Sequence, residues 1–127
     1  MCLTENSCSV IITYRVREGL LMDSVEVCML LDFYGQLLTE RTREILELRF
    51  QEDMSLAEIA EDCGISRQAA HDAIHRGVAS LTEYEEKLKL VERFTLQKKT
   101  ISSAFEALEE HNEEKAKELL STLVEEL

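Results

Sequence analysis

Proline is absent from this sequence, and glycine occurs only four times in 127 residues. Because proline and glycine are the residues that most often interrupt helices and shape turns, their scarcity favours long helices. Of all residues, 45% are hydrophobic and 31% are charged, as is usual for amphipathic helices in a globular protein. We therefore expect an all-α fold with a single core, since the chain has the length of one domain.

The chain is strongly acidic, with a formal net charge of −12 and a pI near 4.7. No segment is basic: residues 39–81, for example, contain five arginines and nine acidic residues. Nucleic-acid phosphates repel such a chain unless its basic residues gather on one face. Any nucleic-acid site must therefore depend on a few well-placed cations.

Four cysteines, Cys2, Cys8, Cys28 and Cys63, show neither C-x-x-C pairing nor zinc-type spacing. We expect reduced thiols, with Cys28 and Cys63 in the core. The sequence has neither an apolar run of about 20 residues, as a membrane span requires, nor a small-residue cleavage site. These features predict a cytoplasmic protein without a membrane span.

Residues 1–21 form an N-terminal extension that differs from the rest of the chain. Its segment 9–16 is rich in β-branched residues, whereas the pattern after Met22 is helical. Codons for Arg17, Glu18 and Gly19 can resemble a bacterial ribosome-binding sequence placed just before Met22. Either translation starts at Met22 and the extension is a start-site artefact, or it is a poorly ordered tail.

Apolar residues at helical spacing predict a series of helices after Met22. The expected ranges are 23–37, 40–51, 56–63, a long helix from residue 67 past residue 91, 101–110 and 113–126. The long helix carries a heptad-like stripe that consists of Ala70, Ile74, Gly77, Leu81, Tyr84, Leu88 and Val91. This stripe belongs either to the core of the same chain or to an interface with a second subunit.

Residues 55–74 form a helix-turn-helix pattern. Ser55 and Ser66 are expected to cap the two helices, and Gly64 suits the left-handed residue at the turn. Ala60 is small enough for close helix crossing, and Ile65 is apolar enough to fill the corner. We take these five residues as the structural positions of the motif.

The exposed face of the second helix provides the candidate nucleic-acid-binding residues Arg67, Gln68, His71, His75 and Arg76. Gln68 has the donor and acceptor that read an adenine edge, and either arginine can contact phosphate or guanine. The two histidines add positive charge at lower pH. The alternative is that the motif is an inherited scaffold that now serves protein contacts.

The same histidines are a weak candidate for a metal site. His71 and His75 are four residues apart, but the sequence has no H-E-x-x-H glutamate and no third ligand at an obvious spacing. A nucleophile elbow, a phosphate-binding glycine loop and a paired-carboxylate site are also missing. We therefore expect no metal, no cofactor and no enzyme activity.

Together with residues 38–50, the motif resembles the promoter-reading region of bacterial sigma factors. More closely, residues 31–39 (LDFYGQLLT), 66–69 (SRQA) and 84–88 (YEEKL) resemble the YlxM family of small bacterial proteins. The resemblance covers about residues 22–90. It implies a sigma-like helix-turn-helix fold, a regulatory role and a link to the signal recognition particle pathway through gene neighbourhood.

These observations predict an extension at 1–21, a helix-turn-helix domain at 22–91 and a C-terminal helical pair at 92–127, packed on the same core. The first functional hypothesis is a non-catalytic regulatory protein that binds duplex DNA or signal recognition particle RNA. The alternative is an interaction module whose acidic helices bind the particle's protein component without reading DNA. A homodimer through the long helix or the C-terminal pair is also expected, because short helices would otherwise leave apolar faces exposed.

Overall fold

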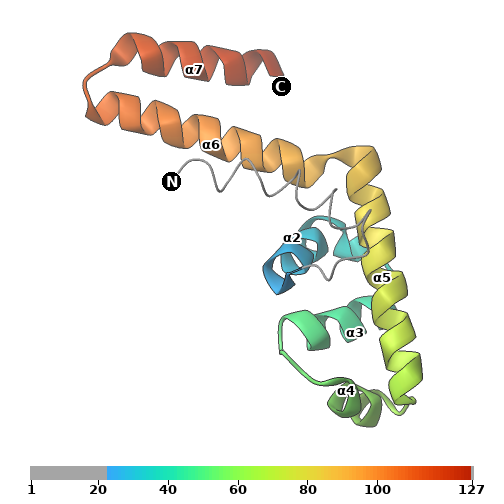
Figure 1. The fold of residues 1–127 in the computed structure, drawn as a ribbon. Coiled ribbons are helices and arrows are strands. Elements are labelled where there is room, and N and C mark those ends of the chain that lie inside the picture. Colours follow the sequence, from blue (N-terminus) through green and yellow to red (C-terminus); the bar gives the residue numbers. More distant parts are fainter. Residues whose placement is uncertain (1–22, 127) are drawn as a thin grey trace. The chain divides into compact units, whose positions relative to one another are not determined.

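The computed structural model describes residues 23–126, and every regular element among them is helical (Figure 1). The α-helices are α2 (Ser24–Tyr34), α3 (Glu40–Phe50), α4 (Leu56–Cys63), α5 (Arg67–Leu88), α6 (Leu90–Glu109) and α7 (Glu113–Glu126), and a 3₁₀ turn, η1 (Gly35–Leu37), follows α2. The prediction of an all-α fold is confirmed. The predicted extension, with Cys2 and Cys8, lies outside the described residues.

The chain divides into two compact units, with the boundary between Val91 and Glu92. The described part of the first, residues 23–91, contains α2 to α5 and is called the helix-turn-helix unit below. The described part of the second, residues 92–126, contains most of α6 and all of α7 and is called the hairpin unit. The packing of the C-terminal pair on the core of the first unit stays a prediction.

The core of the helix-turn-helix unit is built around α5, which packs against α2, α3 and α4. Among its fully buried side chains are Leu30 of α2, Leu46 of α3, Ile59 of α4 and Leu81 of α5. Each contributes about 1.5–3 kcal/mol relative to an exposed side chain. The long helix therefore fixes the three shorter ones, and its opposite face is left to solvent.

The predicted caps of the motif are present. The Ser55 Oγ accepts a hydrogen bond from the Glu58 amide at 3.2 Å, and the Ser66 Oγ accepts one from the Ala69 amide at 3.0 Å. Gly64 has φ +66°, in the left-handed region, and the following Ile65 amide donates to the Ala60 carbonyl at 2.9 Å. The left-handed Gly64 thus ends α4, and the Ser66 cap starts α5 only a few residues later.

Gly77 allows α5 and α3 to approach closely. A Cβ at this position would lie 2.7 Å from the Cδ1 of Leu46 and 3.0 Å from the Cγ2 of Thr42. Such distances are shorter than a normal carbon contact, so the helices cross at a point where only glycine fits.

The prediction of one long helix past Val91 is wrong. Helix α5 ends at Leu88, Lys89 adopts a left-handed conformation with φ +58°, and α6 starts at Leu90 instead of Ile101. The hydroxyl of Tyr34 accepts from the Leu90 amide at 3.0 Å, and the Glu85 carboxylate accepts from the Val91 amide at 3.1 Å. These side chains satisfy amides at the start of α6, which makes the break possible. The first predicted helix, 23–37, is also shorter in the structure: α2 ends at Tyr34, and the 3₁₀ turn η1 follows it.

Cys28 and Cys63 are free thiols, but they are half-buried and not part of the buried core in which they were predicted; Cys63 packs against that core. The Cys28 Sγ donates to the Phe50 carbonyl at 3.5 Å. Burial, with a smaller contribution from the charge of Asp32, raises the pKa of the Cys28 thiol. This thiol therefore stays protonated at neutral pH.

Candidate nucleic-acid interface

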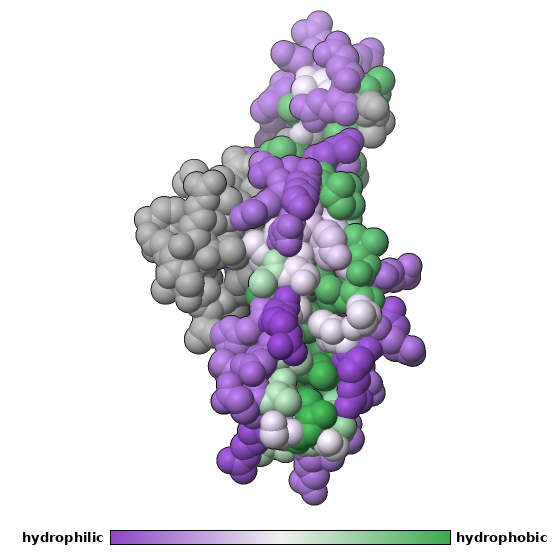
Figure 2. All heavy atoms as spheres, turned by 90° about the vertical axis from the view of Figure 1, so that its right-hand side faces the viewer, coloured by the Kyte–Doolittle hydropathy of each residue, from purple (hydrophilic) through white to green (hydrophobic). Residues whose placement is uncertain are grey.

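All five candidate residues are exposed on α5, as the sequence predicts. At about 100° per residue, Gln68 and His75 lie near the centre of the exposed face, with His71 to one side. Arg67 and Arg76 lie at its opposite edges and are about 14 Å apart along the helix axis. In Figure 2, hydrophilic side chains project from the lower end of the molecule, where α4 and the start of α5 lie.

Asp72 lies on this face between Gln68 and Arg76 and was not among the predicted nucleic-acid-binding residues. Its Oδ1 accepts a hydrogen bond from the Gln68 Nε2 at 2.9 Å and lies 3.4 Å from the His71 Nδ1. The hydrogen bonds from His71 and Gln68 hold the pKa of the Asp72 carboxyl below its ordinary value. The face therefore carries a fixed negative charge between its two arginines.

The Asp72 carboxylate changes what the face can recognise. It holds the amide donor of Gln68, which must be released before Gln68 can make both bonds to an adenine edge. A carboxylate itself accepts from the amino group of cytosine, whereas it repels phosphate. The i, i+4 spacing of Gln68 and Asp72 is visible in the sequence and was the signal that could have revealed the pair.

The rings of His71 and His75 are in contact at an interplanar angle of 45°, with centroids 4.2 Å apart. Their spacing on one helix explains the contact, because residues four apart lie one above the other. Within the described part of the chain, no group of three His, Cys, Asp or Glu side chains is arranged to hold a metal ion. Both histidines are exposed and form part of the polar face of α5.

The arginines of α3 have a different role from those of α5. Arg41 donates to the Cys63 carbonyl, Arg43 pairs with Glu47 at 3.7 Å, and Arg49 donates to the Met54 carbonyl at 2.9 Å. Arg67 and Arg76 form neither an ion pair nor a hydrogen bond within residues 23–126. They are the two arginines of this unit that remain available to phosphate.

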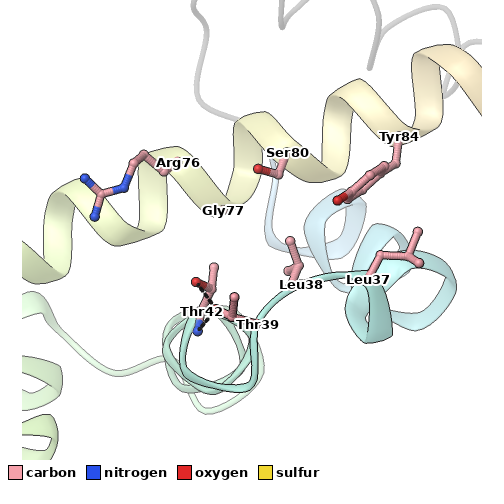
Figure 3. Close-up of a pocket in the computed structure, with 8 residues that line it drawn as sticks. All are labelled: Leu37, Leu38, Thr39, Thr42, Arg76, Gly77, Ser80 and Tyr84. Carbon is pink, nitrogen blue, oxygen red and sulfur yellow. Dashed lines mark hydrogen bonds between the residues drawn. The ribbon is translucent and has the colours of Figure 1, made fainter.

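A pocket of about 190 Å³ lies between the start of α3 and the middle of α5 (Figure 3). Its lining residues are Leu37, Leu38, Thr39, Thr42, Arg76, Gly77, Ser80 and Tyr84. The hydroxyls of Thr39 and Thr42 bond to each other at 2.8 Å, and Thr39 also caps α3. Because ligand pockets usually measure about 300–1,000 Å³, we interpret this one as a packing gap beside Gly77.

The described residues form no helix that is both long enough and apolar enough to cross a membrane.

Comparison with known proteins agrees with this geometry. A family described as "Putative helix-turn-helix protein, YlxM / p13 like" matches residues 21–122. A protein of Acetivibrio thermocellus is 58% identical over 78 residues, which are 61% of this chain and 67% of the relative. A protein of Desulforamulus reducens is 39% identical over 107 residues, which are 79% of this chain and 92% of the relative. A protein of Fusobacterium nucleatum is 43% identical over 108 residues, which are 85% of this chain and 98% of the relative. All three are named UPF0122 proteins.

Proposed function

Because the chain belongs to the YlxM / p13-like helix-turn-helix family, we propose that it is a non-catalytic regulatory protein that binds nucleic acid through α5. One observation carries this proposal: a polar stripe on the exposed face of α5 lies between Arg67 and Arg76, which form no hydrogen bond or ion pair with the residues that the structure describes. An α-helix fits the major groove of duplex DNA, where flanking cations contact phosphates and central side chains contact base edges. In this arrangement Gln68, Asp72 and His75 read the bases.

Charge limits the strength of this interaction. The helix-turn-helix region 39–81 has a net charge of −4, so the surroundings of the face repel phosphate. With about two to four cationic contacts per subunit, binding is weak at physiological salt and increases steeply as salt is lowered. Two subunits acting together would double the number of contacts.

The resemblance to YlxM proteins supports a place in the signal recognition particle pathway, in the cytoplasm. The nucleic acid is then either duplex DNA upstream of the protein's own gene or the RNA of the particle. The two targets differ in geometry, because the deep, narrow major groove of an RNA helix does not admit a recognition helix. Preference for the duplex DNA would support reading by α5, whereas preference for the RNA would indicate contact through loops or phosphates.

A titration of both nucleic acids at low and at physiological salt tests the proposal. We expect Arg67→Ala to weaken binding, because it removes a cation at the edge of the face. Lys87→Ala is the matched control, since it removes a positive charge from the far end of the same helix, where Lys87 pairs with Glu83 at 2.9 Å. Equal effects of the two substitutions would contradict a role for the α5 face.

A second candidate function rests on the exposed carboxylates at the turn between α6 and α7. Glu109, Glu110, Glu113 and Glu114 are all exposed there, which gives an acidic surface suited to a basic protein. In this alternative the protein binds the protein component of the particle and does not read DNA. Replacing the four glutamates with glutamine should then abolish the interaction, while Arg67→Ala should have no effect on it.

A further inference from the structure

The hairpin unit is built with small side chains inside and most of its large apolar side chains outside. Helices α6 and α7 are joined at His111, which has φ +60°, and Asn112, whose amide donates to the Ala107 carbonyl at 2.8 Å. The Asn112 side chain then accepts from the Lys115 amide at 3.2 Å and starts α7, which runs back beside α6 (Figure 1). Two antiparallel helices with so short a turn form a helical hairpin.

The buried side chains of this unit are alanines: Ala104, Ala107 and Ala116 are 1–2% exposed. Leu119 and Leu123 of α7 are half-buried, whereas the other large apolar side chains of the described hairpin are exposed. Ile101, Phe105 and Leu108 of α6 are 51%, 62% and 49% exposed, and Leu120 and Val124 of α7 are 42% and 68% exposed. The fully buried side chains of the pair are thus methyl groups, and most of its large apolar side chains are exposed, which is unusual for a self-sufficient helix pair.

The outward side chains of the two helices lie on the same side of the hairpin. On α6, Ile101, Phe105 and Leu108 lie on one stripe along the helix. This stripe is rotated about 90–100° around the helix axis from the alanines, in the sense in which the chain advances. On α7, Leu120 and Val124 are turned from Ala116 in the same rotational sense. In two antiparallel helices, stripes rotated in the same sense from the contact between the helices lie on the same side of the hairpin. The five residues therefore form one apolar face.

This face offers apolar surface to a partner, because the alanine contacts inside the hairpin bury little apolar area. Large apolar side chains with an aromatic residue near the middle are also what the centres of protein interfaces contain.

We propose that a second copy of this chain covers the face, with the two α6 helices antiparallel across a two-fold axis near residue 103. The charges along α6 support both the partner and the direction. The first half of the helix carries Glu92, Arg93, Lys98 and Lys99, with a net charge of +2, and the second half carries Glu106 and Glu109, with a net charge of −2. Antiparallel pairing places each basic half against an acidic half, whereas parallel pairing would place like charges together.

This geometry makes a specific contact. With the axis near residue 103, Lys98 of one copy lies beside Leu108 and Glu109 of the other, and Phe105 lies close to the axis. The phenylalanines would then be buried at the centre and the ion pairs would lie at the rim, the usual arrangement of an interface. The inference concerns the hairpin unit and does not depend on binding of nucleic acid.

Sedimentation equilibrium of the full chain, without nucleic acid, tests the proposal. We expect a monomer–dimer equilibrium whose dissociation constant rises at least tenfold in Phe105→Glu, because the substitution puts charges at the centre of the interface. Leu96→Glu is the matched control: Leu96 is 48% exposed on the same helix but points away from the apolar face. Its dissociation constant should stay within about twofold of the wild type.

A charge exchange tests the antiparallel direction. Lys98→Glu and Glu109→Lys should each weaken the dimer, and the double variant should recover most of the wild-type affinity. Far-ultraviolet circular dichroism of each variant checks that the helices persist. A chain that stays monomeric at the highest concentration reached would overturn the proposal, and so would equal weakening by Leu96→Glu and Phe105→Glu. A dimer that shows no recovery in the double variant would overturn the antiparallel arrangement.

Discussion

The hydroxyl of Tyr34 lies 2.6 Å from the carboxylate of Glu85, to which it donates a buried hydrogen bond across 51 positions of the sequence. The same hydroxyl accepts from the Leu90 amide, and the same carboxylate accepts from the Val91 amide. The pair thus ties α2 to the end of α5 and to the first turn of α6. It explains how the helix can break at Lys89 without leaving these buried polar groups unpaired.

Tyr34→Phe should lower the free energy of unfolding by about 1–3 kcal/mol, because it removes the donor to Glu85 and the acceptor for the Leu90 amide. Urea denaturation followed by circular dichroism measures the change. Tyr84→Phe is the control, since Tyr84 packs against the ring of Tyr34 at 6.1 Å but takes no part in these hydrogen bonds. An equal loss in both variants would show that the hydrogen bonds contribute nothing specific.

The same hydrogen bond predicts a dependence on alkaline pH. Burial, followed by the hydrogen bond to Glu85, raises the pKa of Tyr34 from 10 to about 12. A raised pKa means that the folded state holds the proton more tightly, so this contribution is complete below pH 10 and is lost as pH rises towards 12. The stability difference between wild type and Tyr34→Phe should therefore shrink between pH 10 and 12. A difference that stays constant across this range would contradict the buried bond.

Gly77→Ala should destabilise the helix-turn-helix unit by about 1–3 kcal/mol, because its Cβ would overlap the Cδ1 of Leu46. Gly35→Ala provides a comparison at a second helical glycine. There the nearest atom, the Cδ of Arg43, lies 3.5 Å from the new Cβ, and φ is −55°. Thermal unfolding should show little loss, or a gain, for Gly35→Ala. Similar losses at both sites would show that helix packing at Gly77 is not the cause.

Asp72→Asn should increase the affinity for duplex DNA several-fold at low salt. The substitution removes a negative charge that lies between Gln68 and Arg76 on the α5 face, and it weakens the hydrogen bond that holds the Gln68 amide. Fluorescence anisotropy with labelled duplex measures the effect. Glu86→Gln, which removes an exposed carboxylate further along α5, should change affinity less. If the two substitutions act equally, only the net charge of the protein matters.

The motif could be predicted from sequence because its signals are local. The Ser55 and Ser66 caps and the left-handed Gly64 each depend on residues within a few positions, so their chemistry is readable along the chain. The break at Lys89 could not be predicted in this way. Lysine rarely adopts a left-handed conformation, and here Tyr34, far away in sequence, helps to stabilise the junction.

The candidate site was predicted in part. Helical spacing identifies the exposed face and its five residues, because burial of the opposite side by Ala70 and Ile74 follows from the apolar pattern. The role of Asp72 depends on which rotamer its side chain adopts and which donors it meets, and spacing alone does not decide that. The same holds for the arginines of α3, whose internal partners became visible only in the folded chain.

The salt dependence of duplex binding tests the central claim, that α5 binds nucleic acid through Arg67 and Arg76. The logarithm of the binding constant should fall linearly with the logarithm of salt concentration, by about 0.9 for each phosphate that is neutralised. Replacing both arginines with alanine should therefore make the slope shallower by about 1.8, whereas Lys87→Ala should leave it unchanged. An identical slope in the wild type and the double variant would contradict the claim.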